Sequence, residues 1–166
     1  KKRIVEGIKD NKLHKILTLN EFEENELSSN DELKIIQKLN KYAKKADIVI
    51  VQDFGHGFFT KNIINYLEKK TKKLSINVQT NSLNYGYNII SKKFKKTDYF
   101  SLDERELKLF AGEKVINHEK KLKILTKFLF SKKGFLTCGG RFSMMFSKNK
   151  ILKIPILNKR AIDTMG

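Results

Sequence analysis

Polar residues follow each strongly apolar segment in the middle of this sequence, and they include types that could bind phosphate or a metal ion. The polar stretches are 52–57, 79–82, 103–106 and 137–141. In an open parallel sheet, ligands bind beyond the carboxyl ends of the strands, so residues directly after an apolar run are the first candidates for a site. We therefore expect the four stretches to meet in one crevice.

Asp103 and Glu106 are the two carboxylates whose spacing would suit a magnesium ion. Mg²⁺ takes oxygen ligands and often keeps water in its coordination shell, so a carboxylate pair near glycines and backbone amides is what a magnesium–phosphate site needs. A structural interpretation explains the same residues, because Asp103 can cap a helix that contains Glu106 in a capping box. The residues alone leave both interpretations open.

The elements that would position these stretches alternate between strand and helix. The segment 46–53 has a continuous β-branched centre, which is typical of a strand buried on both faces of a parallel sheet. Apolar periodicity and capping residues predict the other elements. The predicted strands are a hairpin within 3–19 and segments at 74–79, 99–102, 135–137, 142–146 and 151–156. The predicted helices run from Asn30-Asp31 to about Lys45, after a cap at Thr60, through Ile89 and Ile90 as a short stretch, and at 104–110 and 117–130. Leu33 and Tyr42 belong to the apolar period of the first helix, and Phe128 lies on the apolar side of the last.

The order of these elements predicts an α/β fold with a mostly parallel, wound sheet, flanking helices, an N-terminal hairpin and antiparallel strands at the C-terminal edge. A single proline and no linker rich in serine or glycine indicate one piece. The only cysteine is Cys138, and no Cys/His cluster has zinc-ligand spacing. No run approaches the roughly 18 apolar residues of a membrane span, and the N-terminus lacks the apolar stretch of a signal peptide, so we expect a cytoplasmic protein without membrane contact.

The formal net charge of +17 is the unusual bulk property of this chain. Taken alone, it would suggest a polyanionic partner such as nucleic acid. Nearly all of the positive charge is lysine, and arginine occurs only at positions 3, 105, 141 and 160. Because arginine makes the bidentate phosphate and base contacts best, solvated surface lysine is favoured over a functional basic patch, and we expect no nucleic-acid partner.

The succession of residues 46–57, 77–82 and 103–106 resembles the ribokinase (PfkB) family of carbohydrate kinases in order and spacing. Within that family it is most similar to the kinase domain of bifunctional heptose kinase/nucleotidyltransferase enzymes, where an Asp-Tyr-Gly-x-Gly loop and an Asn-x-Gln-Thr-Asn strand end recur. The similarity continues through 136–141, which resembles a Thr-x-Gly-x-x-Gly phosphate loop. It reaches 162–166, which resembles the start of an Asp-Thr-x-Gly-Ala-Gly-Asp signature, and so covers nearly the whole chain.

This resemblance implies a ribokinase-like fold and transfer of the γ-phosphoryl group of ATP, with Mg²⁺, to a sugar or sugar-phosphate hydroxyl. Residues 1–19 would form part of a lid hairpin, and 20–166 would form the nucleotide-side part of the domain. The implied roles are nucleotide binding for Thr137, Gly139, Arg141, Asp163 and Gly166, Mg²⁺ binding through water for Asp103 and Glu106, the phosphate and acceptor side for Asp53, Gln79 and Asn81, and the substrate lid for Arg3. A solvated role for Arg3 and a structural loop role for His56, which could also contact phosphate, stay open.

Two departures from the family pattern lead to an alternative function. The catalytic base is expected just after Gly166, outside this chain, and Phe142 stands where the phosphate loop has its second glycine. A side chain there is expected to obstruct close approach of the backbone to a phosphate. The alternative is a catalytically inactive kinase-like domain that serves as a structural or dimerisation partner of a sugar nucleotidyltransferase. The resemblance also implies a homodimer and a heptose-type precursor of surface polysaccharide as substrate.

Overall fold

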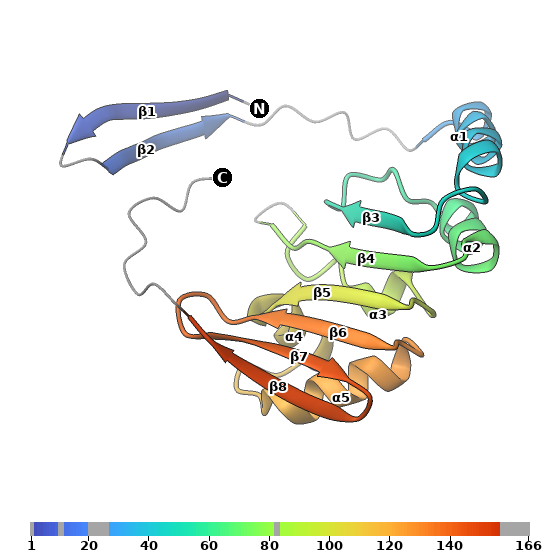
Figure 1. Ribbon diagram of the computed structural model, residues 1–166. Coiled ribbons are helices and arrows are strands. Elements are labelled where there is room, and N and C mark those ends of the chain that lie inside the picture. The colour runs from blue at the N-terminus through green and yellow to red at the C-terminus, as the bar shows by residue number, and fades with distance from the viewer. Residues whose placement is uncertain (1, 10–11, 20–26, 82–83, 157–166) are drawn as a thin grey trace.

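The strands of this protein form two separate sheets, an N-terminal antiparallel pair and a six-stranded sheet (Figure 1). The pair consists of β1 (Lys2–Lys9) and β2 (Lys12–Leu19) and matches the predicted hairpin. The computed structural model describes residues 2–9, 12–19, 27–81 and 84–156.

The six-stranded sheet has the order β3-β4-β5-β6-β7-β8, so neighbours in the chain are also neighbours in the sheet. The first four strands are parallel, and the last two pairs are antiparallel. This is the predicted mostly parallel sheet with an antiparallel edge. The strands are β3 (Val49–Asp53), β4 (Leu74–Val78), β5 (Tyr99–Asp103), β6 (Lys133–Thr137), β7 (Phe142–Ser147) and β8 (Lys150–Pro155).

Side-chain caps set the starts of the four longer helices, because each capping oxygen accepts a hydrogen bond from an otherwise unpaired N–H of the first turn. The caps are Ser28, Thr60, Asp103 and Asn117. The first helix therefore begins after Ser28, slightly before the predicted start. The helices are α1 (Ser29–Tyr42), α2 (Lys61–Lys70), α3 (Ile90–Lys93), α4 (Glu104–Ala111) and α5 (His118–Phe128).

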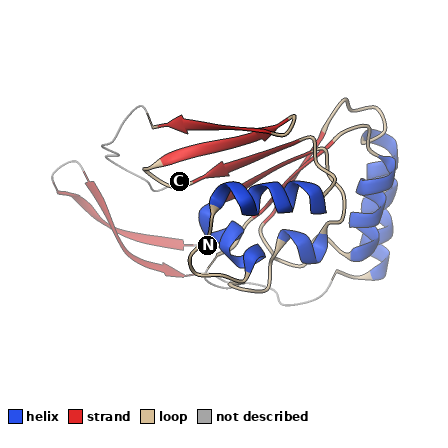
Figure 2. Ribbon diagram, turned by 90° about the horizontal axis from the view of Figure 1, so that it is seen from below, coloured by secondary structure: helices blue, strands red, loops and turns tan. Residues whose placement is uncertain are grey.

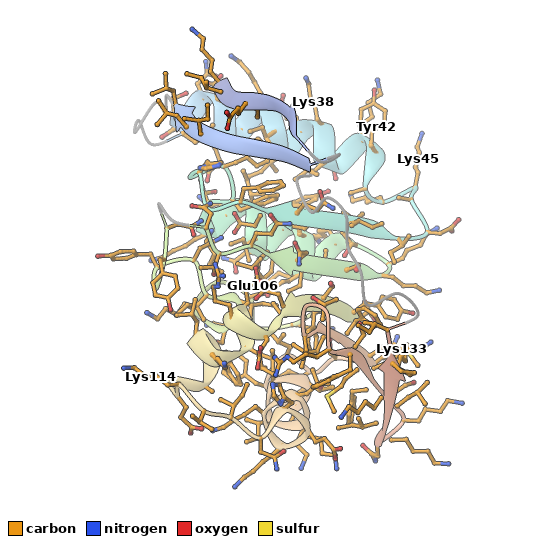
Figure 3. All side chains as sticks on the ribbon, turned by 90° about the vertical axis from the view of Figure 1, so that its left-hand side faces the viewer. Lys38, Tyr42, Lys45, Glu106, Lys114 and Lys133 are labelled. Atoms are coloured by element: carbon orange, nitrogen blue, oxygen red, sulfur yellow. The ribbon has the colours of Figure 1, made fainter. Side chains whose placement is uncertain are left out.

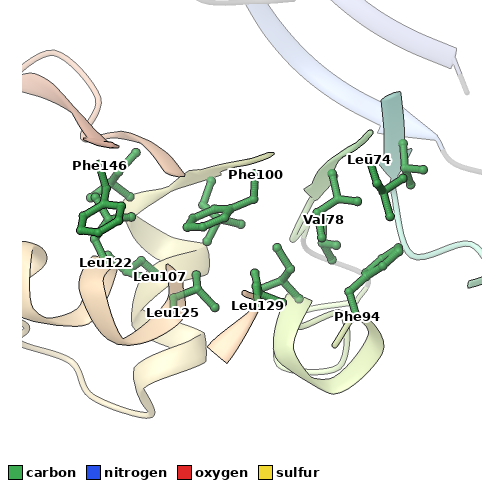
Figure 4. Packing of buried hydrophobic residues seen from close by; sticks show 14 of the residues in the cluster. Leu74, Val78, Phe94, Phe100, Leu107, Leu122, Leu125, Leu129 and Phe146 are labelled. Carbon is green, nitrogen blue, oxygen red and sulfur yellow. The ribbon is translucent and has the colours of Figure 1, made fainter. Parts of the chain in front are cut away.

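The helices gather on one face of the six-stranded sheet (Figure 2). The parallel strands are added in one direction, and right-handed crossovers between them place every connecting helix on the same side. Apolar side chains of this covered face and of the helices form one continuous core. Figure 4 shows Phe100 of β5 near Leu107 of α4 and Leu122 and Leu125 of α5.

Gly134 of β6 makes room for the ring of Phe100 in this core. A Cβ atom at position 134 would lie 2.3 Å from Cζ of Phe100. No carbon contact that short is tolerated, so the neighbouring strand can carry a phenylalanine here only because residue 134 has no side chain.

The opposite face of the sheet, which we call the open face, carries exposed apolar side chains and no helix of the described residues. Ile50 of β3 is 67% exposed there. The expectation that 46–53 is a strand buried on both faces is therefore wrong: β3 begins at Val49, and within it only Val51 and Asp53 are buried. Phe135, Leu152 and Ile154 are further exposed large apolar residues of the open face.

Three further apolar residues are more exposed than their periodicity predicts. Leu33 and Tyr42 of α1 are 58% and 62% exposed, and α1 buries no residue fully. Phe128, at the end of α5, is half-exposed, and its ring centroid lies 6.3 Å from that of Phe110, which packs partly buried against the core. Periodicity identifies an apolar stripe, but it does not say whether another element covers that stripe.

The lysines of the described residues mostly point into solvent. Figure 3 shows Lys38, Lys45, Lys114 and Lys133 reaching outward from different elements, and all four are exposed. Their scatter over several elements fits solvated surface lysine rather than a single basic patch. Among the described residues, no helix combines the length and apolarity needed to cross a bilayer.

Candidate functional site

The carboxyl ends of β4, β5 and β6 surround a small polar cavity, which we call the strand-end cavity. Its volume is about 290 Å³. Gln79, Asp103, Glu106 and Thr137, all predicted as site residues, line it together with Asn77, Thr80, Ser101 and Leu102. The parallel pairing of the three strands brings their ends to one edge, as the position of a ligand site in open sheets requires.

A second cavity, which we call the loop cavity, adjoins the first and has a volume of about 490 Å³. Asp103 and Thr137 line both cavities, and the remaining residues are Glu104, Arg105, Lys108 and Gly139. Gly139 has φ of +56°, a left-handed conformation that side chains disfavour. The structure thus brings three of the four predicted polar stretches, those after β4, β5 and β6, to one place.

Glu106 ties the ends of β4 and β5 together beside the strand-end cavity. Its Oε1 accepts the N–H of Thr80 at 2.9 Å, and its Oε2 accepts the N–H of Asp103 at 2.8 Å. Oδ1 of Asp103 accepts the N–H of Glu106 in return at 2.7 Å, which completes the capping box of α4. Burial raises the pKa of Glu106, and the nearby charge of Asp103 adds to this effect, while the backbone hydrogen bonds from Asp103 and Thr80 act against it.

The arrangement of these carboxylates fits a magnesium ion that keeps most of its water. Both oxygens of Glu106 already accept a backbone hydrogen bond, whereas Asp103 is exposed and uses only one oxygen in the cap. Within the described parts of the chain, no cluster of three or more His, Cys, Asp or Glu residues could hold a metal. An ion here would bind Asp103 and solvent, which matches the preference of Mg²⁺ for partial hydration.

Asp53 does not reach either cavity. Its side chain is buried, shares the covered face with Val51, and accepts the N–H of Gly55 at 2.8 Å. Lys93 of α3 forms an ion pair with its second oxygen. Asp53 therefore fixes the turn that follows β3, in which Gly55 has φ of +77°.

Two asparagines that the sequence analysis did not single out hold this turn against the end of β4. Nδ2 of Asn84 donates to the carbonyl oxygen of Phe54 at 2.7 Å. Nδ2 of Asn88 donates to the carbonyl oxygens of Gln79 at 2.9 Å and Asp53 at 3.3 Å. Both asparagines are buried, although the polar composition of 80–88 gave no sign that these two differ from their neighbours.

Asn81 belongs to the same amide cluster rather than to the cavities. Its Nδ2 donates to the carbonyl oxygen of Phe54 at 3.2 Å, and its backbone N–H donates to Oδ1 of Asn84 at 2.8 Å. His56 lies exposed in the neighbouring turn. The stretch after β3 is thus linked to the site through a hydrogen-bonded loop and supplies no lining residue of either cavity.

Phe142, which we expected to obstruct the phosphate loop, is not among the residues that line either cavity. It starts β7 with a negative φ, and its ring packs partly buried against the core. The ring meets His118 edge-on at 5.7 Å, and Nζ of Lys153 lies 4.2 Å from its centroid. The chain reverses at Gly139 and Gly140, and Phe142 then pairs with Pro155 of β8.

The remaining predicted site residues cannot be placed at the cavities. Asp163 and Gly166 lie outside the described residues. Arg3 belongs to β1, but its side chain is likewise outside what the structure describes. Arg141 follows the glycine turn and forms an ion pair with Glu104, a residue of the loop cavity.

Comparison with solved structures identifies the fold as ribokinase-like. Phosphofructokinase-2 from Escherichia coli, in complex with potassium, matches with a TM-score of 0.65 at 7% identity over 87% of this chain and 46% of its own. A putative phosphofructokinase from Staphylococcus aureus matches with a TM-score of 0.53 at 14% identity over 82% of this chain and 43% of its own.

A pyrophosphate-dependent kinase in the ribokinase family, solved with a pyrophosphate analogue and myo-inositol, matches with a TM-score of 0.53 at 15% identity over 80% of this chain and 46% of its own. The chain thus spans less than half the length of each of these three structures. No protein-family model and no curated protein matches the sequence. At these identities the likeness establishes the fold, and the activity has to be argued from the site.

Proposed function

We propose that this chain is the nucleotide-side part of a sugar kinase that transfers the γ-phosphoryl group of ATP to a sugar hydroxyl. The observation that carries the proposal is the pair of adjoining cavities at the carboxyl edge of the parallel sheet, one bordered by Asp103 and the other by Gly139. Phosphoryl transfer needs little covalent chemistry from the protein and depends on positioning and charge stabilisation. A carboxylate, a glycine turn and cations at one edge meet those needs.

Each group around the cavities has a role in this proposal. Asp103 holds Mg²⁺, with Glu106 acting through water, and Mg²⁺ when bound neutralises charge on the phosphates. The hydroxyl of Thr137 and the backbone at Gly139 bind phosphate oxygens, because a left-handed glycine presents its amide without a side chain in the way. Gln79 borders the acceptor side, and Arg3, Asp163 and Gly166 keep the lid and nucleotide roles that the family resemblance implies.

Asp53 and Asn81 support the acceptor side indirectly in this proposal. They shape the turn after β3 through the hydrogen bonds to Gly55 and Phe54. A turn held in this way would stay in place while substrates bind, because its backbone carbonyls are already paired.

The finer part of the proposal concerns the acceptor and the partners. The loop 53–57 and the strand end 77–81 are most similar to those of heptose kinases that are joined to a nucleotidyltransferase. We therefore propose a heptose-type sugar phosphate as the acceptor. We also propose a nucleotidyltransferase as an attached or associated partner, and a homodimer as the assembly. A panel of heptose and hexose phosphates, with ADP release as readout, tests the acceptor. Equal turnover of all sugars would contradict the heptose preference.

The activity itself is tested with the longest protein product that contains this chain, supplied with Mg-ATP or Mg-pyrophosphate and the sugar panel. We expect turnover with ATP, and we expect Asp103→Asn to lower it by about tenfold or more, because the amide loses the charge that attracts Mg²⁺. Asparagine caps helices as well as aspartate does, so α4 should remain intact.

Glu113→Gln is the matched control, since it also removes one carboxylate, and Glu113 pairs with Lys121 without lining either cavity. We expect this control to keep full activity. Binding of Mg-ATP without turnover of any sugar would favour the alternative of an inactive kinase-like domain. Phe142, the residue of this chain that favoured the alternative, lines neither cavity.

A further inference from the structure

Glu104, which lines the loop cavity, is surrounded by the basic side chains of His118, Lys108 and Arg141. Nε2 of His118 lies 2.8 Å from its Oε1, and Nζ of Lys108 lies 3.4 Å from the same oxygen. The guanidinium of Arg141 pairs with its Oε2.

The paired cations are the groups that a phosphate in this cavity would need. A carboxylate and a phosphate compete for the same N–H donors, and a guanidinium binds either in a bidentate manner. The side chains of Arg141 and Lys108 are 56% and 37% exposed, so both can turn toward a ligand without opening the core. The ring of Phe142 lies 5.6 Å from the guanidinium carbon of Arg141 and would keep it near the cavity after release from Glu104.

We propose that Glu104 sets the affinity of the loop cavity for polyphosphate by competing with the ligand for Arg141 and Lys108. This inference rests on the proposed function, because it assumes that a polyphosphate chain occupies the cavity. Before binding, Glu104 neutralises both cations. On binding, the phosphate oxygens take over Arg141 and Lys108, while His118 keeps Glu104 in place through its hydrogen bond.

The test measures binding of sodium tripolyphosphate by calorimetry, with and without Mg²⁺, in the 166-residue chain. Glu104→Gln keeps an acceptor oxygen but removes the competing charge, so we expect binding about tenfold tighter than in the unmodified chain. Glu113→Gln changes the net charge by the same amount at a residue that does not line the cavity, and we expect it to alter the affinity by less than about twofold. In an Arg141→Gln background, Glu104→Gln should lose most of its gain.

Each outcome decides something. Equal gains in Glu104→Gln and Glu113→Gln would reduce the effect to net charge and overturn the inference. Weaker binding in Glu104→Gln would mean that Glu104 positions the cations for the ligand, which is the opposite of competition. If the unmodified chain binds tripolyphosphate and Glu104→Gln binds it no more tightly, this inference alone is wrong. If no variant binds tripolyphosphate although urea denaturation shows that all are folded, the polyphosphate site and the proposed function are both wrong.

Discussion

Glu106 combines a structural role with a position next to the candidate metal site. Its two oxygens join the backbone of Thr80, at the end of β4, to that of Asp103, at the end of β5. The remaining lone pairs can accept hydrogen bonds from water, while direct coordination falls to Asp103. The spacing of Asp103 and Glu106 suggested either a metal pair or a capping box. The geometry contains the capping box, and the proposed metal site rests on Asp103.

The raised pKa of Glu106 makes the stability of the protein depend on pH. Because the folded state favours the protonated form, the contribution of Glu106 is fully present below its ordinary pKa of 4.5 and is lost as pH rises through the raised value. We expect Glu106→Gln to remove this part of the pH dependence. The substitution should also lower the free energy of unfolding by about 1–3 kcal/mol, since the NH₂ group of the glutamine would face a backbone N–H and leave that donor unpaired.

Urea unfolding between about pH 4 and about pH 8 measures how the free energy of unfolding changes with pH, in a range that begins where carboxylates ordinarily titrate. Glu113→Gln serves as reference, because Glu113 is exposed on its side chain and makes no backbone contact of this kind. An unchanged slope in Glu106→Gln would show that another group causes the pH dependence.

At the scale of elements, the amide cluster determines how the turn after β3 sits beside the sheet edge. Asn88→Ala removes a buried side-chain donor that bonds the carbonyl oxygens of Asp53 and Gln79, and we expect a loss of about 1–3 kcal/mol in the free energy of unfolding together with faster hydrogen exchange in residues 53–57. Asn62→Ala removes an exposed hydrogen bond to Glu32 and should change stability by less than about 0.5 kcal/mol. Equal effects of the two substitutions would contradict a special role of the cluster.

The contact between β5 and β6 is tested by adding a single methyl group. Gly134→Ala would place Cβ against the ring of Phe100, and we expect it to destabilise the protein by about 1–3 kcal/mol or more, because a packed core accommodates extra volume only through strain. Gly140→Ala meets no atom within 4 Å and should be nearly neutral. A neutral Gly134→Ala, measured by urea denaturation, would mean that the two strands are less tightly packed than described.

The sequence predicted the kind and order of these elements well, and it predicted their environment less well. Alternating apolar runs and capping residues such as Thr60 and Asp103 act locally, so they can be identified along the chain. The exposure of Ile50 depends on which elements cover the sheet, which no local pattern states. The same limit applies to Asn84 and Asn88, which bond the backbone of Phe54 and Asp53 at the end of β3, and to Phe142, whose position follows from the register of β7.

At the scale of the whole molecule, the sheet is covered on one side and open on the other among the described residues. Sheets with parallel strands are usually buried on both faces. The apolar residues of the open face therefore mark a surface that favours contact with other apolar groups, in the same way as other exposed apolar patches.

Substituting Ile50 and Leu152 by serine tests this surface. Because both side chains are more than half exposed, we expect the free energy of unfolding to change by less than about 0.5 kcal/mol per substitution, while binding of an apolar dye and self-association decrease. Ile76→Ser, on the covered face, should unfold the protein, because it places a hydroxyl in the core. Strong destabilisation by Ile50→Ser would show that the open face is covered.

The central claim is that the strand ends of β4, β5 and β6 form one polyphosphate site, and amide chemical-shift mapping during titration of the chain with Mg-ATP tests it most directly. We expect the largest amide chemical-shift changes at Thr80, Asp103, Thr137 and Gly139, and little change in α1, which lines neither cavity. Saturation without shifts at these four amides, or with the main shifts elsewhere in the described residues, would contradict it.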